Sequence, residues 1–354
     1  MSETDDMRPK VEREANEAKP RRAANGYSYF PGCSLTSSAG EYDVSFRMVA
    51  RELGIQLDEI KDWNCCGASP APHHWGGNLG VLLPARNLHL AASAHDAMVA
   101  PCAGCYNRFK NAQHELERSE DIRQQAERVF GESVRYQTEI LNLVQFFGRA
   151  VRPEAFAERT QGRLAGIRLA TYYGCLLTRP ASILKFDNPR NPASMKPLLW
   201  ATGAQATHFP FKSECCGSYM GLAKKEIVLR ASRRIIEVAQ DMGFDAIVTV
   251  CPLCHQNLDL RQEQINKTFG TSLDIPVLYF SQVLGLALGF SADDLGISAH
   301  VVSARNLIAK IEQGGKGREG AGTGGRSTGR STSRSNGRSI GRATGLGRRQ
   351  RAVS

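Results

Sequence analysis

The sequence predicts an α/β fold of two homologous, pseudo-twofold related halves, each a small, mostly parallel sheet with helices. Three observations predict it: a duplicated five-cysteine pattern, strands that alternate with helices in both halves, and cysteines that follow strand ends. Alternating strands and helices favour parallel sheets, and ligands bind at the carboxyl ends of parallel strands. We therefore expect one binding site at the strand C-terminal edge of each half.

The duplication is visible in the cysteine spacing. The first set is Cys33, Cys65, Cys66, Cys102 and Cys105, and the second is Cys175, Cys215, Cys216, Cys251 and Cys254. Intervening residues number 31, 0, 35 and 2 in the first set and 39, 0, 34 and 2 in the second. The flanks repeat too, with Gly-Cys at the start and Cys-Cys-Gly in the middle. We place the two domains at residues 27–160 and 161–312.

The elements expected in the first half are, in chain order, a strand over 26–31, a helix over 43–53, a strand over 55–60, a helix over 85–95 and a buried strand over 97–100. Apolar residues at helical spacing favour a buried face on the first helix that includes Val44, Met48, Val49 and Leu53, with Gly54 as its stop.

The second half repeats this alternation. A strand over 167–173 ends at Cys175, and a strand over 245–250 ends at Cys251. The helix between them, over 226–242, has apolar residues at Ile227, Ala231, Ile235, Val238 and Met242. The apolar window 277–290 is shorter than the ~20 residues that cross a bilayer. We expect it to be a closing helix packed on the second half or a subunit contact, rather than a membrane-surface helix.

The formal net charge of +10 belongs mostly to one end of the chain. Residues 313–354 carry ten basic residues and one acidic residue among Gly, Ser and Thr, whereas residues 27–312 carry only +1. A segment of that composition cannot bury enough apolar surface to offset its chain entropy, so we expect a disordered tail. A nucleic-acid or scaffold role through this tail is the competing class of function.

The N-terminal segment and the cysteine content indicate the cellular compartment of the protein. Residues 1–26 are polar, with six acidic and six basic residues, and we expect a disordered extension rather than a signal peptide. Ten cysteines in 354 residues are too few for a disulfide-stapled scaffold. We therefore expect a cytoplasmic protein whose cysteines bind metal or do redox chemistry.

The five-cysteine sets favour iron–sulfur binding over three alternatives. Structural zinc takes four ligands, usually as two Cys-x2–4-Cys pairs, and a vicinal pair suits a polynuclear cluster better. A thioredoxin-type Cys-x-x-Cys leaves six cysteines unexplained, and buried structural cysteines would not repeat their spacing. The usual ferredoxin cysteine run is absent, so we expect electrons to come from another subunit.

The sequence around the cysteines resembles a known family. Tyr-Phe-Pro-Gly-Cys-Ser-Leu (29–35), Asp-Trp-Asn-Cys-Cys-Gly-Ala (62–68) and Val-Cys-Pro-Leu-Cys-His (250–255) resemble the cysteine-rich "CCG" domains of the B subunit of heterodisulfide reductases. The resemblance covers residues 27 to about 288. Iron–sulfur subunits of glycolate and lactate oxidases, and of one type of succinate dehydrogenase, share the five-cysteine motif alone.

The resemblance implies two non-cubane [4Fe–4S] clusters that face each other, with a disulfide cleaved between them. It implies that Cys33, Cys65, Cys66, Cys102 and Cys105 hold the first cluster and that Cys175, Cys215, Cys216, Cys251 and Cys254 hold the second. The implied partners are a ferredoxin-like C subunit and a flavin-containing A subunit, with no membrane span and no nucleic acid.

The substrate stays open. A disulfide such as CoM-S-S-CoB is one possibility, either cleaved or formed. A bacterial sulfur-oxidising complex that handles thiols or persulfides is an alternative, and the tail and N-terminal extension favour it weakly. An electron-transfer subunit of a glycolate or lactate oxidase type of enzyme is another alternative.

Three further sites have a structural interpretation as good as the functional one. His73 and the adjacent His74 could line the cavity or lie on a surface loop. Lys212 could neutralise cluster charge or be solvated, and His255 could donate to substrate sulfur or be an ordinary helix-start residue. None of them is assigned a catalytic role.

Overall fold

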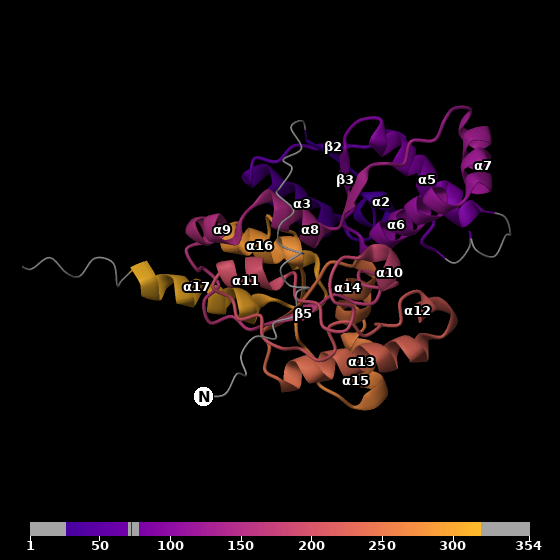
Figure 1. The fold of residues 1–354 in the computed structure, drawn as a ribbon. Helices are drawn as coiled ribbons and strands as arrows, with labels where there is room; N and C mark the ends of the chain where they lie inside the picture. Colours follow the sequence, from indigo (N-terminus) through magenta and orange to yellow (C-terminus); the bar gives the residue numbers. More distant parts are fainter. Residues whose placement is uncertain (1–25, 70–71, 73–77, 320–354) are drawn as a thin grey trace, which may run out of the picture.

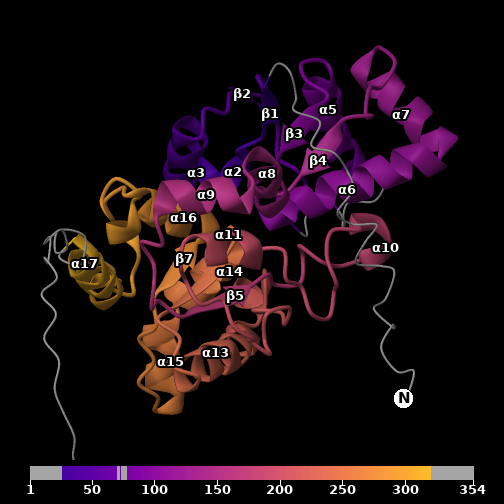
Figure 2. The same ribbon diagram turned by 60° about the vertical axis from the view of Figure 1, so that its left-hand side comes forward.

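The protein has two parallel sheets with helices packed around them, which confirms the predicted α/β class (Figures 1 and 2). The structure is a computed structural model and describes residues 26–69, 72 and 78–319. One sheet has the strand order β2-β1-β3-β4 and the other β5-β6-β7, and neighbouring strands run parallel in both.

The first half contains β1 Tyr27–Tyr29, α2 Gly32–Leu35, α3 Gly40–Glu52, β2 Leu57–Glu59, α5 Leu79–Ala92, β3 Ala97–Val99, α6 Ala103–Arg118, α7 Glu120–Phe130, β4 Glu139–Leu141, α8 Leu143–Ala150 and α9 Pro153–Thr160. Each strand predicted here is present, with shorter bounds. Strand β4 was not predicted.

The second half contains β5 Leu169–Tyr172, α10 Ala181–Leu184, α11 Lys196–Ala201, α12 Met220–Ala223, α13 Lys225–Asp241, β6 Ala246–Thr249, α14 Pro252–Asp259, α15 Gln262–Phe269, β7 Val277–Tyr279, α16 Phe280–Leu288, the 3-10 turn η1 Ile297–Ala299 and α17 Arg305–Glu319. Strands β3, β5 and β6 are buried along their whole length, as parallel strands covered on two faces are.

The buried faces of two helices differ from the prediction. Helix α3 begins at Gly40 and buries Tyr42, Phe46 and Val49, whereas Val44 is 46% exposed. Helix α13 buries Val228 and its neighbours, whereas Ile227 is 50% exposed. Each helix carries apolar residues on more than one face. The neighbouring elements therefore determine which face is buried, and the spacing of apolar residues alone does not.

The window 277–290 is a strand followed by a helix, and its main partner lies in the other half. Strand β7 completes the second sheet, and α16 then packs along α3 and also contacts α9 and α11 (Figures 1 and 2). The expected packing on the second half is present in the contacts of α16 with β6 and α11, and α16 also closes the junction with the first half through α3. Within the described residues, no helix is both long enough and apolar enough to span a bilayer.

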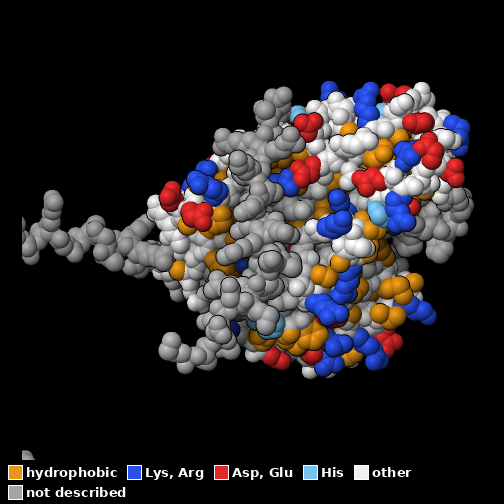
Figure 3. All heavy atoms as spheres, viewed as in Figure 1, with side chains coloured by type: hydrophobic (Ala, Val, Ile, Leu, Met, Phe, Trp, Pro, Cys, Tyr) orange, Lys and Arg blue, Asp and Glu red, His pale blue; other side chains and the backbone are white. Residues whose placement is uncertain are grey.

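Helix α17 continues through Glu319, so residues 313–319 of the expected tail are helical. The rest of that tail and all but the last residue of the N-terminal extension, together with His73 and His74, lie outside the described residues. On the face drawn in Figure 3, basic side chains are interspersed with acidic ones, in keeping with the near-neutral charge of residues 27–312.

The two halves share one core and meet at Tyr42. The largest cluster of buried apolar residues runs through both sheets without a break. The hydroxyl of Tyr42 lies 3.1 Å from the carbonyl oxygen of Pro101 and 3.1 Å from that of Val250. These carbonyls follow β3 and β6, so one side chain of α3 connects the ends of the two central strands. The ring of Tyr42 also stacks on that of Tyr279 with centroids 4.0 Å apart.

We expect Tyr42→Phe to lower the free energy of unfolding by about 1–3 kcal/mol, because the ring still stacks but buried carbonyl oxygens lose their donor. Urea unfolding of the purified protein measures this. Tyr27→Phe is the control, because Tyr27 is partly buried and packs by its ring edge on Phe146. The expected change for the control is within about 0.5 kcal/mol. Equal midpoints for Tyr42→Phe and the unaltered protein would show that this bridge contributes nothing.

Candidate functional site

The Cys-x-x-Cys pair of each half lies where a central strand passes into a helix. Cys102 follows β3 and precedes α6 as its N-terminal flanking residue, and Cys251 has the same place between β6 and α14. Cys105 and Cys254 fall in the first turns of these helices. First-turn backbone N–H groups have no partner within the helix, so they are available to thiolates and to a negative cluster. This placement confirms the predicted loop-to-helix position.

The five thiols of each half converge. In the first half, hydrogen-bond contacts join Cys33 to Cys65, Cys65 to Cys66, Cys66 to Cys105, and Cys105 to Cys102. In the second half, contacts join Cys175 to Cys215 and Cys254 to both Cys216 and Cys251, with the Sγ atoms of Cys216 and Cys254 3.5 Å apart. The structure thus brings each sequence-predicted set of five together at one place.

Exposure follows almost the same order in both sets. The first cysteine of the vicinal pair is exposed in both halves, and the second is buried together with both cysteines of the Cys-x-x-Cys pair. The leading cysteine differs slightly, since Cys33 is exposed and Cys175 is partly exposed. Each set is therefore open to solvent on one side and closed by protein on the other.

Two glycines in each half shape the cavity for the sulfurs. Gly32 and Gly174 have φ of 66° and 67°, and a Cβ on them would lie 3.2 Å from Sγ of Cys105 and 3.1 Å from Sγ of Cys254. The backbone N–H groups of Gly67 and Gly217 each donate to the vicinal cysteine two residues earlier, both at 3.4 Å. Crowded sulfurs with backbone donors fit a thiolate-bound iron–sulfur cluster.

The first cysteine of each vicinal pair also favours the thiolate form. A hydrogen bond from Cys33 lowers the pKa of Cys65, and a hydrogen bond from Cys175 lowers the pKa of Cys215 to about 6. The donors Cys33 and Cys175 have raised pKa values because each donates a hydrogen bond to its vicinal partner, because they are partly desolvated and because neighbouring cysteines carry negative charge. Thiolate is the form that binds metal, so the exposed vicinal cysteine of each set is prepared to be a ligand.

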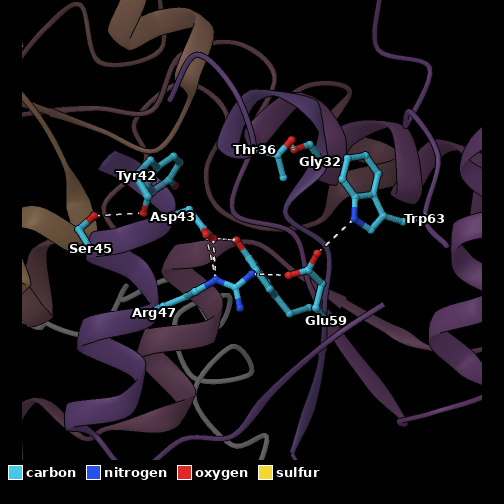
Figure 4. Close-up of polar contacts among 9 residues, drawn as sticks. Gly32, Thr36, Tyr42, Asp43, Ser45, Arg47, Glu59 and Trp63 are labelled. Atoms are coloured by element: carbon cyan, nitrogen blue, oxygen red, sulfur yellow. Dashed lines mark hydrogen bonds and ion pairs between the residues drawn. The ribbon is translucent and has the colours of Figure 1, made fainter. Parts of the chain in front are cut away.

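The segment before the first vicinal pair is anchored on α3 and α5 (Figure 4). Arg47 binds Asp43 within α3 and Glu59 at the end of β2, and Glu59 accepts a hydrogen bond from Trp63 at 3.3 Å. The backbone N–H of Asn64 donates to Asn87 at 2.9 Å. These contacts fix the chain just ahead of Cys65.

Each Cys-x-x-Cys helix also holds a loop of the other half. Asn107 of α6 donates to the carbonyls of Leu176 and Arg179, at 2.8 and 2.7 Å, in the loop that follows Cys175. Gln256 of α14 donates to Ser38 at 2.9 Å, in the loop that follows Cys33. Asn107 and Gln256 both stand two residues after the last cysteine of their set. These two cross-contacts, with the Tyr42 bridge, bring the two cysteine sets together across the junction.

The lone candidates are held by the protein rather than aimed at the cysteines. The Lys212 ammonium is buried and donates to Asn191 at 2.9 Å and to the carbonyl of Pro192 at 3.2 Å. His255 packs on Tyr279 with ring centroids 4.3 Å apart, and its Nε2 lies 3.0 Å from the carbonyl oxygen of Val277. Burial lowers the pKa of His255 to about 3, which keeps the ring neutral.

Tyr219 is a site residue that sequence reasoning missed. It stands three residues after Cys216, yet its hydroxyl reaches the first half beside Gly104 and Cys102. Comparison of the two Cys-Cys-Gly segments could have singled it out, because the matching position in the first half is Ser69.

No three His, Cys, Asp or Glu side chains of the described part are arranged to hold a metal ion, so the ligand sets stay a prediction.

Comparison with known proteins agrees with the duplication. The family model "CCG: Cysteine-rich domain" matches residues 27–110 and 169–259. The chain is 33% identical over 284 residues to the 8-methylmenaquinol:fumarate reductase membrane anchor subunit of Wolinella succinogenes, covering 79% of this chain and 98% of the relative. It is 29% identical over 292 residues to the B subunit of the ferredoxin:CoB-CoM heterodisulfide reductase of Methanosarcina mazei, covering 81% and 97%.

A solved structure supports the fold alone. The crystal structure of a hypothetical protein from Helicobacter pylori matches with a TM-score of 0.59 at 12% identity, over 79% of this chain and 52% of that one.

We expect Gly217→Ala to disrupt the second cysteine set more than Gly67→Ala disrupts the first. Both glycines have positive φ, 95° and 72°, so an added Cβ costs about 1–2 kcal/mol in each. At Gly217 the Cβ would also lie 2.8 Å from the backbone Cα of Val228, whereas at Gly67 the nearest atom is 3.6 Å away. Thermal unfolding and bound iron per chain measure the difference. Equal losses for the two variants would contradict it.

Proposed function

The chain belongs to the family of cysteine-rich CCG-domain proteins that includes the B subunit of heterodisulfide reductases, and from this premise we propose that it is the disulfide-handling subunit of such a complex. Membership gives its coarser role, which is an iron–sulfur redox subunit of an oxidoreductase complex. The finer proposal is that two [4Fe–4S] clusters of the non-cubane type bind in it and that a disulfide is cleaved, or formed, between them.

One observation carries this proposal: the two cysteine sets have matching surroundings and meet across one junction. Cleavage of a disulfide takes up two electrons and two protons and releases two thiols, so the substrate presents two sulfurs. Two matched sites, each able to deliver one electron, suit that stoichiometry. A single set would have to deliver both electrons or release a half-reduced product.

The proposed ligands are Cys33, Cys65, Cys66, Cys102 and Cys105 for one cluster and Cys175, Cys215, Cys216, Cys251 and Cys254 for the other. When bound, these clusters would supply electrons singly to the substrate. The exposed cysteines of each set mark the side from which substrate would reach it. On the closed side, Tyr42 fixes the carbonyls that precede Cys102 and Cys251, which keeps the two buried pairs at a constant separation.

A second candidate rests on the relative from Wolinella succinogenes. That protein is named as a membrane anchor subunit of a fumarate reductase, and it is 33% identical to this chain. The same cluster sites would then pass electrons to or from a partner subunit instead of acting on a disulfide. If the chain is instead the disulfide-handling subunit, its proposed partners are a ferredoxin-like C subunit and a flavin-containing A subunit.

Three further parts of the main proposal concern the substrate, nucleic acid as a partner and the domain boundary. A disulfide such as CoM-S-S-CoB and the thiol or persulfide substrates of a bacterial sulfur-oxidising complex would use the same two sites. Residues 27–312 have a formal net charge of +1, which supports the proposal that nucleic acid is not a partner of the cysteine core. We keep the proposed domain boundary between residues 160 and 161, which is supported by the end of α9 at Thr160, between the last strand of the first sheet and the first strand of the second.

We expect anaerobically purified protein to hold about eight irons and a matching amount of acid-labile sulfide per chain, as two four-iron clusters require. Elemental analysis with EPR of the oxidised and reduced protein measures this. Replacing Cys102 with Ala should remove one cluster and leave the other, because each set has its own ligands. One or two zinc ions with no sulfide would overturn the iron–sulfur assignment.

We expect the assembled complex, given a reduced viologen dye, to release two thiols for every two electrons when a disulfide is supplied. Cys65→Ala and Cys215→Ala should each abolish thiol release, since each removes a ligand of one site. A complex in which this chain is truncated after Glu319 should retain the rate of thiol release if the cysteine core carries the activity. Electron flow to fumarate or a quinone without any disulfide cleavage would instead favour the second candidate.

A further inference from the structure

Tyr219 carries a group from the second half into the cysteine site of the first. It lies in the loop between Gly217 and α12, directly after the second vicinal pair. A Cβ built on Gly104 would lie 3.6 Å from the Tyr219 hydroxyl oxygen and 3.6 Å from Sγ of Cys102. The hydroxyl and the sulfur therefore flank the same point, and the missing side chain of Gly104 leaves room for both.

The surroundings of Tyr219 favour a hydroxyl that donates. A phenol is protonated at neutral pH, so its O–H can donate a hydrogen bond to a nearby sulfur. Tyr219 is also only partly buried, in contrast with Tyr42 and Tyr279, so a molecule that enters from solvent can reach it.

This contact breaks an otherwise close symmetry between the two sites. The glycines before the leading cysteines, the backbone donors after the vicinal pairs and the cross-contacts of Asn107 and Gln256 all occur in matching positions. At the position of Tyr219 the first half has Ser69, which is exposed. A serine side chain is too short to reach across the junction as the tyrosine ring does.

We propose that the Tyr219 hydroxyl donates a hydrogen bond to sulfur at the first-half site and makes that site unequal to the second toward the two sulfurs of an unsymmetrical disulfide. The inference rests on the proposed function, and it adds a positioning residue together with a substrate class. Hydrogen bonds to thiolate or cluster sulfur stabilise the reduced, more negative state and so raise its reduction potential.

The test compares Tyr219→Phe, which removes only the hydroxyl, with Tyr27→Phe as the matched control. We expect both variants to keep the iron content of the unaltered protein. In Tyr219→Phe the EPR-monitored potential of one cluster should fall while that of the other stays constant. Cys102→Ala identifies the first-half signal by its loss, and the shifted signal should be that one. Tyr219→Ser, which copies Ser69, should give the same shift.

Turnover supplies the second measurement. For an unsymmetrical disulfide, kcat/KM of the complex with Tyr219→Phe should fall about tenfold to a hundredfold, as loss of a hydrogen bond to a charged group implies. The control should match the unaltered complex. With symmetrical disulfides the loss should be smaller, because their orientation no longer matters.

Several outcomes would overturn the inference while the proposed function stands. One such outcome requires an unaltered complex that holds its clusters and turns over disulfide. If both cluster potentials in Tyr219→Phe then equalled those of the unaltered complex, or shifted by the same amount, the inference would be overturned. Loss of iron in both Tyr219 variants would also overturn it, because the residue would then be purely structural. Absence of iron, or of disulfide turnover, in the unaltered complex would instead refute the proposed function itself.

Discussion

The arrangement of the whole molecule depends on which group donates hydrogen bonds to the backbone carbonyls where strands β3 and β6 end. The carbonyls of Pro101 and Val250 are buried at the junction of the halves, and buried polar groups need a partner. The Tyr42 hydroxyl lies 3.1 Å from both oxygens and shares its single hydrogen between them. Because each carbonyl directly precedes a Cys-x-x-Cys pair, a single side chain of α3 fixes the start of both α6 and α14. The separation of the two cysteine sets follows from this contact.

The rest of the site is built outward from that fixed point. The helix starts supply backbone donors, glycines make room for sulfur, and the loops that carry Cys65 and Cys215 place an exposed cysteine on the solvent side of each set. The outer shell is less symmetrical. In the first half, Arg47, Glu59 and Trp63 anchor the vicinal pair through a chain of charged contacts. In the second, Asn257 donates to Sγ of Cys216 and to the carbonyl of Ser218, at 3.4 and 3.1 Å.

Much of the fold could be predicted from the sequence because its signals are local or repeated. Strand ends before Cys102 and Cys251 and helices directly after them follow from short-range patterns, and the two sets follow from their spacing. The face that α3 buries could not be predicted, because α16, more than 200 residues away, packs against it. Tyr219 was missed for the same reason: residue spacing reports contacts within a half and says nothing of what crosses the junction.

The crossed contacts of Asn107 and Gln256 bear on how the protein matures. Each helix that begins with a Cys-x-x-Cys pair braces the leading-cysteine loop of the opposite half. During synthesis the first half emerges from the ribosome while α14 does not yet exist, so its Cys33 loop lacks that brace. The Gln256 contact to the first-half loop therefore forms only after α14 of the second half has been made. The contacts around the two cysteine sets are complete only in the whole chain, even though its sequence repeats.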